Sequence, residues 1–190
     1  VKTVIPYFKR FINKFPNLKL LAKANEHKVL KCWEGLGYYS RARNLKKTAA
    51  ILLKDFNGRL PKDIEKLMTL PGVGAYTSIS ICAIAHNQPC IPMDGNVERI
   101  LKRVFLLKTK KQISRENLIE KKTFFSSSQR SSDYAQAIME IGALICKPSS
   151  PVCTSCPLMN NCKAYKKNDF LIKTKKKLSK TKYFEANVYK

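Results

Sequence analysis

Four cysteines close together are the clearest chemical feature of the sequence. Cys146, Cys153, Cys156 and Cys162 follow the spacing C-x6-C-x2-C-x5-C, and prolines between them favour a tightly bent loop. Thiolates at this spacing suit a tetrahedral zinc ion or a cysteine-ligated iron–sulfur cluster. The spacing alone does not choose between the two. A pair of disulfides is the weaker alternative, because no secretion signal is visible.

A glycine-containing turn joins two expected helices, over residues 63–69 and 75–86. The turn is Leu70–Gly74, with the sequence LPGVG. Its glycines permit a tight reversal that leaves backbone N–H groups at the start of the second helix without partners. Such groups bind phosphate well. An ordinary connection between helices is an equally good interpretation of this pentapeptide taken alone.

An aspartate stands at the beginning of a further expected helix, over residues 96–106. In the segment PMDGNVERI, Asp94 could cap this helix by accepting from the N–H of Asn96 or Val97. A carboxylate held there, near a phosphate-binding turn, could also stabilise the positive charge that develops on a sugar when its glycosidic bond breaks. That chemistry needs an acid to protonate the departing base. Glu34 is the nearest candidate by context, but beside Trp33 at a helix end we favour a surface or capping role.

The composition points to a folded basic protein. The 37 Lys and Arg residues against 13 Asp and Glu give a formal charge of +24, of which residues 163–190 contribute +8. A basic folded part most often binds nucleic acid; an anionic membrane surface and a general lysine bias are lesser alternatives. The apolar content of 44% excludes a purely disordered polybasic tail. The longest apolar run, around Ile79–Ala85, is far shorter than the roughly 20 residues of a membrane span.

The helix-forming pattern predicts an all-α fold. Apolar residues recur at helical spacing, and no alternating strand is visible before Tyr183. The expected helices cover residues 1–15, 42–56, 63–69, 75–86, 96–106, 115–127 and 133–145. The apolar stripe of the first, from Val1 to Phe15, is expected to face the core. The cysteines outside the cluster are expected to be buried structural residues: Cys32, Cys82 and Cys90.

Changes in composition divide the chain. A polar stretch near residues 107–116 ends a first helical block, residues 1–106, and a second block follows over residues 107–165. Residues 166–182 form a basic linker, and residues 183–190 could open a strand of a further domain.

The three motifs occur in an order and at separations that resemble the helix-hairpin-helix DNA glycosylase superfamily in its iron–sulfur branch. This resemblance covers about residues 1–165 and implies two helical lobes, with DNA between them and a [4Fe–4S] cluster on the four cysteines. The segments Trp33–Leu45 (WEGLGYYSRARNL) and Thr3–Phe8 (TVIPYF) are more similar to the MutY adenine DNA glycosylases than to endonuclease III. Tyr76 stands where endonuclease III-type enzymes have the lysine that forms a Schiff base with the sugar.

The resemblance implies a monofunctional glycosylase that flips out and removes adenine mispaired with 8-oxoguanine or guanine in double-stranded DNA. Asp94 would stabilise the oxocarbenium-like sugar, Tyr76 and Asn96 would line the pocket, and Tyr38 would wedge into the base stack. The remaining implied DNA contacts are Gly72, Val73 and Gly74 on phosphate, with Arg41 and Arg43 equally interpretable as phosphate contacts or surface charges. The expected setting is a monomer in the bacterial cytoplasm, associated with the nucleoid through DNA.

Members of the family carry a catalytic glutamate upstream of the point matching Val1 and a C-terminal Nudix-like domain. Tyr183–Tyr189 resembles only the first strand of that domain. We therefore expect the chain as given to be a fragment that binds DNA and holds a cluster but excises adenine poorly or not at all. Two alternatives remain: an endonuclease III-like pyrimidine glycosylase and lyase, which Tyr76 disfavours, and a non-catalytic iron–sulfur protein that only binds DNA.

Overall fold

The fold is entirely helical over the part of the chain that the structure describes. This structure is a computed structural model, and it describes residues 4–109, 112 and 130–170, in which no strand occurs. The expectation of an all-α fold is confirmed. The α-helices are Ile5–Lys14 (α1), Leu18–Lys23 (α2), Glu26–Trp33 (α3), Ser40–Asp55 (α4), Ile64–Met68 (α5), Ala75–His86 (α6), Gly95–Phe105 (α7), Ser131–Glu140 (α9) and Lys163–Lys166 (α10).

Other expected elements differ from these or cannot be compared. The helix expected at 115–127 and the strand expected near Tyr183 lie outside the described residues. The helix expected over 133–145 is α9 followed by a π-helical turn, Ile141–Ile145. None of the described helices is long and apolar enough to cross a membrane.

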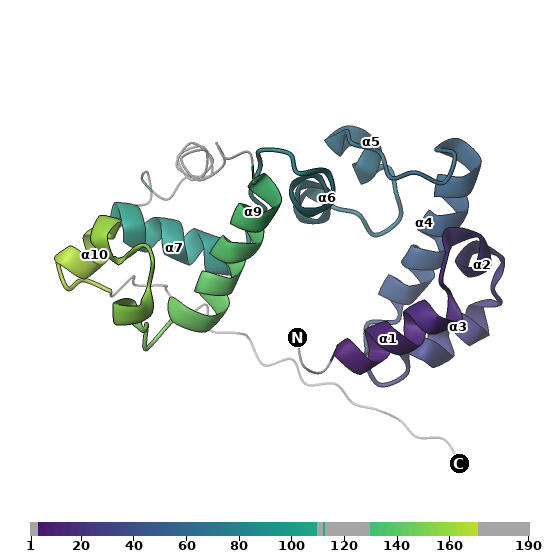
Figure 1. Ribbon diagram of the computed structural model, residues 1–190, viewed down its shortest axis with the longest axis horizontal. Coiled ribbons are helices and arrows are strands. Elements are labelled where there is room, and N and C mark those ends of the chain that lie inside the picture. Colours follow the sequence, from purple (N-terminus) through teal and green to yellow (C-terminus); the bar gives the residue numbers. More distant parts are fainter. Residues whose placement is uncertain (1–3, 110–111, 113–129, 171–190) are drawn as a thin grey trace, which may run out of the picture.

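The N-terminal helices α1 to α4 pack together at one end of the molecule (Figure 1). The short helices α2 and α3 begin at asparagine caps, where Asn17 accepts from the Leu20 N–H at 3.0 Å and Asn25 from the His27 N–H at 2.8 Å. Phe15 is buried in the core of this group, with Phe11 packed beside it. These helices position the segment that carries Tyr38 and Arg41.

The expectation that the whole apolar stripe of α1 faces the core is wrong. Phe8 is 61% exposed, and Ile5 and Ile12 are also exposed. Helix α1 contacts α3 through Phe11 and Trp33. Helical spacing therefore identified an amphipathic helix correctly but did not show which apolar residues have a partner.

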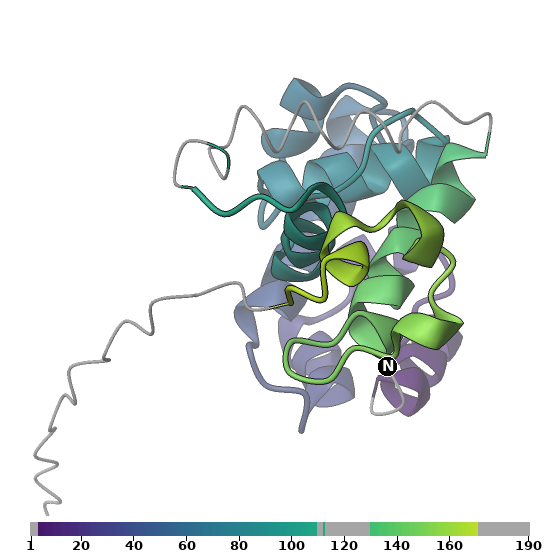
Figure 2. The ribbon, with the colours of Figure 1, turned by 90° about the vertical axis from the view of Figure 1, so that its left-hand side faces the viewer.

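Two further cores continue along the chain. Leu52, Leu67, Leu70 and Cys82 join α4, α5 and α6. A separate core joins α7 to α9 and contains Val97, Ile100, Leu101, Val104 and Ile138. Figure 2 shows α9 and the cysteine-containing loop stacked beside α7. The division made from the sequence groups α7 with residues 1–106, but α7 shares its core with α9. The division itself stays a prediction.

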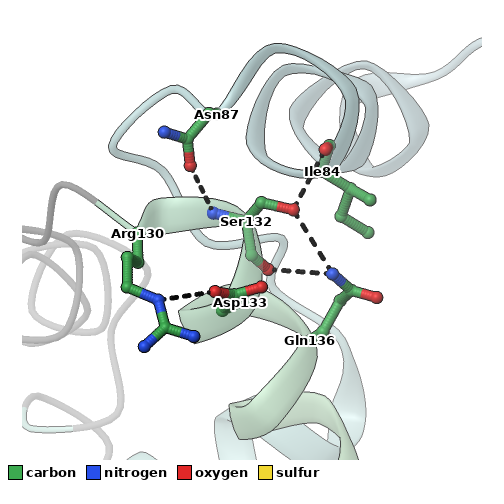
Figure 3. A network of polar contacts seen from close by, with 6 residues as sticks. All are labelled: Ile84, Asn87, Arg130, Ser132, Asp133 and Gln136. Carbon is green, nitrogen blue, oxygen red and sulfur yellow. Dashed lines mark hydrogen bonds and ion pairs between the residues drawn. The ribbon is translucent and has the colours of Figure 1, made fainter.

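A polar junction connects the end of α6 to the beginning of α9 (Figure 3). Asn87 ends α6 in the left-handed conformation, and its side chain accepts from the Ser132 N–H at 2.9 Å. The Ser132 hydroxyl donates to the Ile84 carbonyl at 3.0 Å, and Gln136 bonds back to Ser132. These bonds satisfy groups at the ends of both helices and fix α9 against α6.

Candidate functional site

The glycine-containing turn is held firmly between α5 and α6. The Val73 N–H donates to the Leu70 carbonyl at 3.1 Å, and the Thr48 hydroxyl of α4 donates to the Pro71 carbonyl at 3.1 Å. Gly72 has a φ of +77°, and a Cβ added there would lie 2.9 Å from the Asn44 Cβ. Both facts require glycine at this position. The turn is therefore a specific structure seated on α4.

No side chain in the described part of the chain caps the N-terminus of α6. Its N-cap is Gly74, which has no side chain to accept from the first-turn amides, and no acidic residue lies in that turn. These N–H groups have no partner within the helix, and the helix dipole adds positive potential. Tyr76, in the same turn, is 41% exposed. The arrangement is suited to a phosphate oxygen.

Asp94 caps α7 with both carboxylate oxygens engaged. One oxygen accepts from the Asn96 N–H at 2.9 Å and the Val97 N–H at 2.7 Å, so both donors suggested by the sequence are used. The other oxygen accepts from the Asn96 side-chain amide at 3.2 Å. Three donors hold this half-buried carboxylate in one orientation. A negative charge fixed in this way needs no reorganisation when positive charge develops beside it.

Arg99 connects the Asp94 cap to the cysteine-containing loop. Its guanidinium donates to the Asn96 side-chain oxygen at 2.8 Å and to the Gly142 carbonyl at 2.7 Å, while Nε donates to the Cys146 carbonyl at 2.8 Å. Asn96 therefore lies between Asp94 and Arg99. A continuous chain of hydrogen bonds joins the carboxylate to the backbone of the first clustered cysteine.

Gly142 allows the π-helical turn to approach this network closely. A Cβ on Gly142 would lie 2.7 Å from the Asn96 Cβ and 3.4 Å from the Asn96 backbone. Replacing Gly142 with alanine is expected to push Asn96 away and lower the free energy of unfolding by about 2 kcal/mol. Urea denaturation measures this change. The matched control is Gly95→Ala on α7, where an added Cβ meets nothing within 4 Å; equal effects of the two substitutions would contradict the prediction.

The four clustered cysteines line one cavity. Ile100, Arg103 and Met159 complete part of its wall around Cys146, Cys153, Cys156 and Cys162. Burial, and then the neighbouring thiols, raise the pKa of Cys153; burial also raises the pKa of Cys156. The four cysteines therefore line one partly desolvated space. A metal centre there would have to displace their protons.

The residues around this cavity fit a metal centre that is held by cysteine thiolates. Four thiolates can hold either one tetrahedral zinc ion or an iron–sulfur cluster. The donor set of the cavity, Cys146, Cys153, Cys156 and Cys162, is common to both centres.

Arg103 is a buried cation in the wall of this cavity. It is 4% exposed and donates to the Lys147 carbonyl at 2.6 Å, the Pro148 carbonyl at 2.7 Å and the Cys146 sulfur at 3.3 Å. The Phe170 ring lies 6.0 Å from its guanidinium carbon. Sequence reasoning missed both Arg99 and Arg103. The available signal was two arginines four residues apart on the helix that Asp94 begins.

Tyr38 lies at an exposed, tightly folded turn before α4. Gly35 and Gly37 have positive φ values, and Tyr38 itself has a φ of +50°. The Tyr38 side chain is the most exposed large apolar residue among those described, at 81%. Arg41 lies over the Tyr38 ring, whereas Arg43 forms an ion pair with Glu26 at 3.1 Å.

The remaining sequence candidates occupy simpler positions. Glu34 is exposed at the end of α3, which agrees with the surface or capping role favoured for it. Cys32 and Cys82 are buried as expected, whereas Cys90 is only partly buried. Burial raises the pKa of the Cys82 thiol.

Comparisons with known proteins agree with this geometry. An adenine DNA glycosylase of Buchnera aphidicola subsp. Baizongia pistaciae is 39% identical over 189 residues, which is 97% of this chain and 54% of that protein. An adenine DNA glycosylase of Mus musculus is 39% identical over 173 residues, 88% of this chain and 33% of that protein. The chain thus spans about half the length of the bacterial relative.

Solved structures share the fold. An endonuclease III in a non-covalent complex with DNA matches with a TM-score of 0.69 and 29% identity, covering 88% of this chain and 78% of that one. A thermostable thymine-DNA glycosylase matches with a TM-score of 0.71 and 25% identity, covering 86% and 76%.

The family match covers the elements that carry the turn and the Asp94 cap. Residues 1–123 match the family described as HhH-GPD superfamily base excision DNA repair proteins. With the glycine-containing turn seated at the start of α6 and the capping aspartate at the start of α7, the chain belongs to the HhH-GPD superfamily of base excision DNA repair proteins.

Proposed function

We propose that this chain binds double-stranded DNA and contains the charge-stabilising part of an adenine DNA glycosylase that acts on adenine opposite 8-oxoguanine or guanine. The observation that carries the proposal is the Asp94 carboxylate, fixed by three hydrogen bonds at the start of α7. The adenine DNA glycosylases of Buchnera and mouse support the choice of base. The protein would act as a monomer in the compartment that holds the chromosome, the bacterial cytoplasm.

DNA would be held by its backbone at the glycine-containing turn. Gly72 and Gly74 would offer N–H groups to a phosphate, with the start of α6 behind them. Val73, whose N–H donates to the Leu70 carbonyl, would hold the turn in shape between them against the DNA backbone. Tyr38 would enter the base stack and offset part of the cost of extruding the adenine.

The sugar would be stabilised by charge. As the glycosidic bond breaks, the sugar becomes oxocarbenium-like, and the Asp94 carboxylate would stabilise its positive charge. Asn96, which donates to Asp94 and accepts from Arg99, would keep that carboxylate oriented. Tyr76 would line the pocket without supplying an amine, so no Schiff base would form.

Cys146, Cys153, Cys156 and Cys162 would hold a [4Fe–4S] cluster. When bound, the cluster would cross-link the loop at four points and add a redox-active centre. Arg103 would donate to the Cys146 sulfur, and Arg99 would hold the Cys146 carbonyl. A cluster that orders the loop would thereby also help to fix the positions of Asn96 and Asp94.

The proposal is tested with duplexes that carry adenine opposite 8-oxoguanine, adenine opposite thymine, or thymine glycol opposite adenine. Anisotropy titrations with this chain are expected to show tighter binding to the first duplex. Adenine release is measured with this chain and with a chimera in which the glutamate-bearing segment expected from the family is fused before Val1. Equal affinity for all three duplexes, together with no release by either protein, would refute the proposal and favour a protein that only binds DNA.

A pyrimidine glycosylase with lyase activity is the second candidate, because the endonuclease III fold matches over 88% of the chain. Borohydride trapping separates the two. We expect no covalent protein–DNA adduct, since Tyr76 stands at the position of the Schiff-base lysine. A trapped adduct on a duplex with thymine glycol would favour the second candidate.

A further inference from the structure

Tyr38 is held in an unusual conformation at the surface. A φ of +50° is uncommon for a residue with a large side chain, and such positions persist only where the surroundings determine them. Burial does not explain it, because 81% of the residue is exposed. The explanation has to come from the contacts that Tyr38 makes with its neighbours.

Arg41 supplies those contacts. Its guanidinium carbon lies 5.5 Å from the centre of the Tyr38 ring and 5.5 Å from the centre of the Trp33 ring. Both distances are within the range of cation–π attraction. The same guanidinium donates to the Gly37 carbonyl at 3.5 Å, and the Trp33 indole N–H donates to that carbonyl at 3.1 Å. Arg41 therefore touches both aromatic rings and the backbone that precedes Tyr38.

We propose that Arg41 is a positioning residue, which holds the Tyr38 ring ready to enter the base stack, and that it does not act as a phosphate contact. The inference rests on the proposed function, in which Tyr38 is the wedge. A ring ordered before DNA arrives loses less conformational freedom on binding. Trp33, partly buried against Phe11, is the fixed platform on which Arg41 lies.

The chain contains a matched control for this role. Arg43 lies two residues further along α4 and is also exposed, but its partner is the Glu26 carboxylate at 3.1 Å and no aromatic contact is found for it in the described part of the chain. Substituting Arg43 removes the same charge from the same helix. It leaves the contacts of Tyr38 unchanged.

The experiment separates unstacking from phosphate contact. The probe is a duplex with 2-aminopurine opposite 8-oxoguanine, whose fluorescence rises when the base leaves the stack. Arg41→Gln, Arg41→Lys and Arg43→Gln are each titrated at several salt concentrations. A lost phosphate contact lowers the slope of log K against log salt by about one, whereas lysine keeps that contact. Lysine does not reproduce the stacking of a planar guanidinium.

We expect both Arg41 variants to reduce the fluorescence rise at saturating protein about threefold, with the salt slope changed by less than about half a unit. Arg43→Gln is expected to keep the full rise. The inference is overturned if Arg41→Gln lowers the slope of log K against log salt by about one. It is also overturned if either Arg41 variant gives the same fluorescence rise as the parent. If Arg41→Gln does not fold, the fluorescence rise is measured with Arg41→Lys, which keeps the charge and the length of the side chain. No binding or unstacking by the parent chain would instead overturn the proposed function.

Discussion

Replacing Arg103 with methionine is expected to remove most of the bound iron and to lower the free energy of unfolding by roughly 3 kcal/mol. The guanidinium is buried and donates to the carbonyls of Lys147 and Pro148 and to the Cys146 sulfur. Methionine has a similar volume but no donor, so the two carbonyls and the Cys146 sulfur would lose the partner that the buried Arg103 gives them. Each orphaned group costs about 1–3 kcal/mol. Iron content and urea denaturation measure the two effects.

The control for Arg103 is an arginine whose ion pair is exposed to solvent. Arg130 pairs with Asp133 at 2.7 Å, but its side chain is 82% exposed, and Arg130→Met should change stability by less than about 1 kcal/mol. Arg103→Lys is expected to lie between the methionine variant and the parent, because one ammonium cannot reach all three acceptors in the same geometry. An Arg103→Met protein with full iron content and unchanged stability would show that the loop does not depend on the guanidinium.

Most of the helices were predictable from the sequence because their signals are local, although the short helices α2, α3 and α10 were not expected. The glycine-containing turn, the capping aspartate and the apolar periodicity each depend on residues within one or two helical turns. The same locality explains the failure at α1. Helical spacing places Phe8 on an apolar face, but whether anything covers that face depends on distant segments, and Phe8 is 61% exposed.

The parts of the site that the sequence did not predict are long-range contacts. Arg99 reaches Gly142 and Cys146, which lie 43 and 47 residues away, and Arg103 reaches the same loop. The only local signal, two arginines four residues apart on α7, does not distinguish them from the exposed arginines that are common on amphipathic helices. Only the packing of α7 against α9 shows that this face points inward. The π-helical turn at Ile141–Ile145 was also unexpected, and its Gly142 is the point of closest approach to Asn96.

Replacing Asp94 with asparagine is expected to reduce adenine release at least about 100-fold while leaving DNA binding nearly unchanged. Asparagine is as good an N-cap as aspartate, so the bonds to the Asn96 and Val97 N–H groups can persist. What is removed is the negative charge that would face the developing oxocarbenium ion. Single-turnover release by the chimera that carries the family's glutamate-bearing segment before Val1 measures the chemistry, and anisotropy with this chain measures binding.

The asparagine variant also has a structural cost that must be separated from the chemical one. Its amide nitrogen would face the Asn96 amide, which donates to the second carboxylate oxygen at 3.2 Å, and two donors would then oppose each other. Asp94→Ser serves as the control, because serine caps the helix equally well but places no donor there. If charge is the reason for the loss, both variants lose adenine release to a similar extent and melt within a few degrees of the parent. If serine restores release, the defect of the asparagine variant lies in the Asn96 contact, and Asp94 acts only as a helix cap.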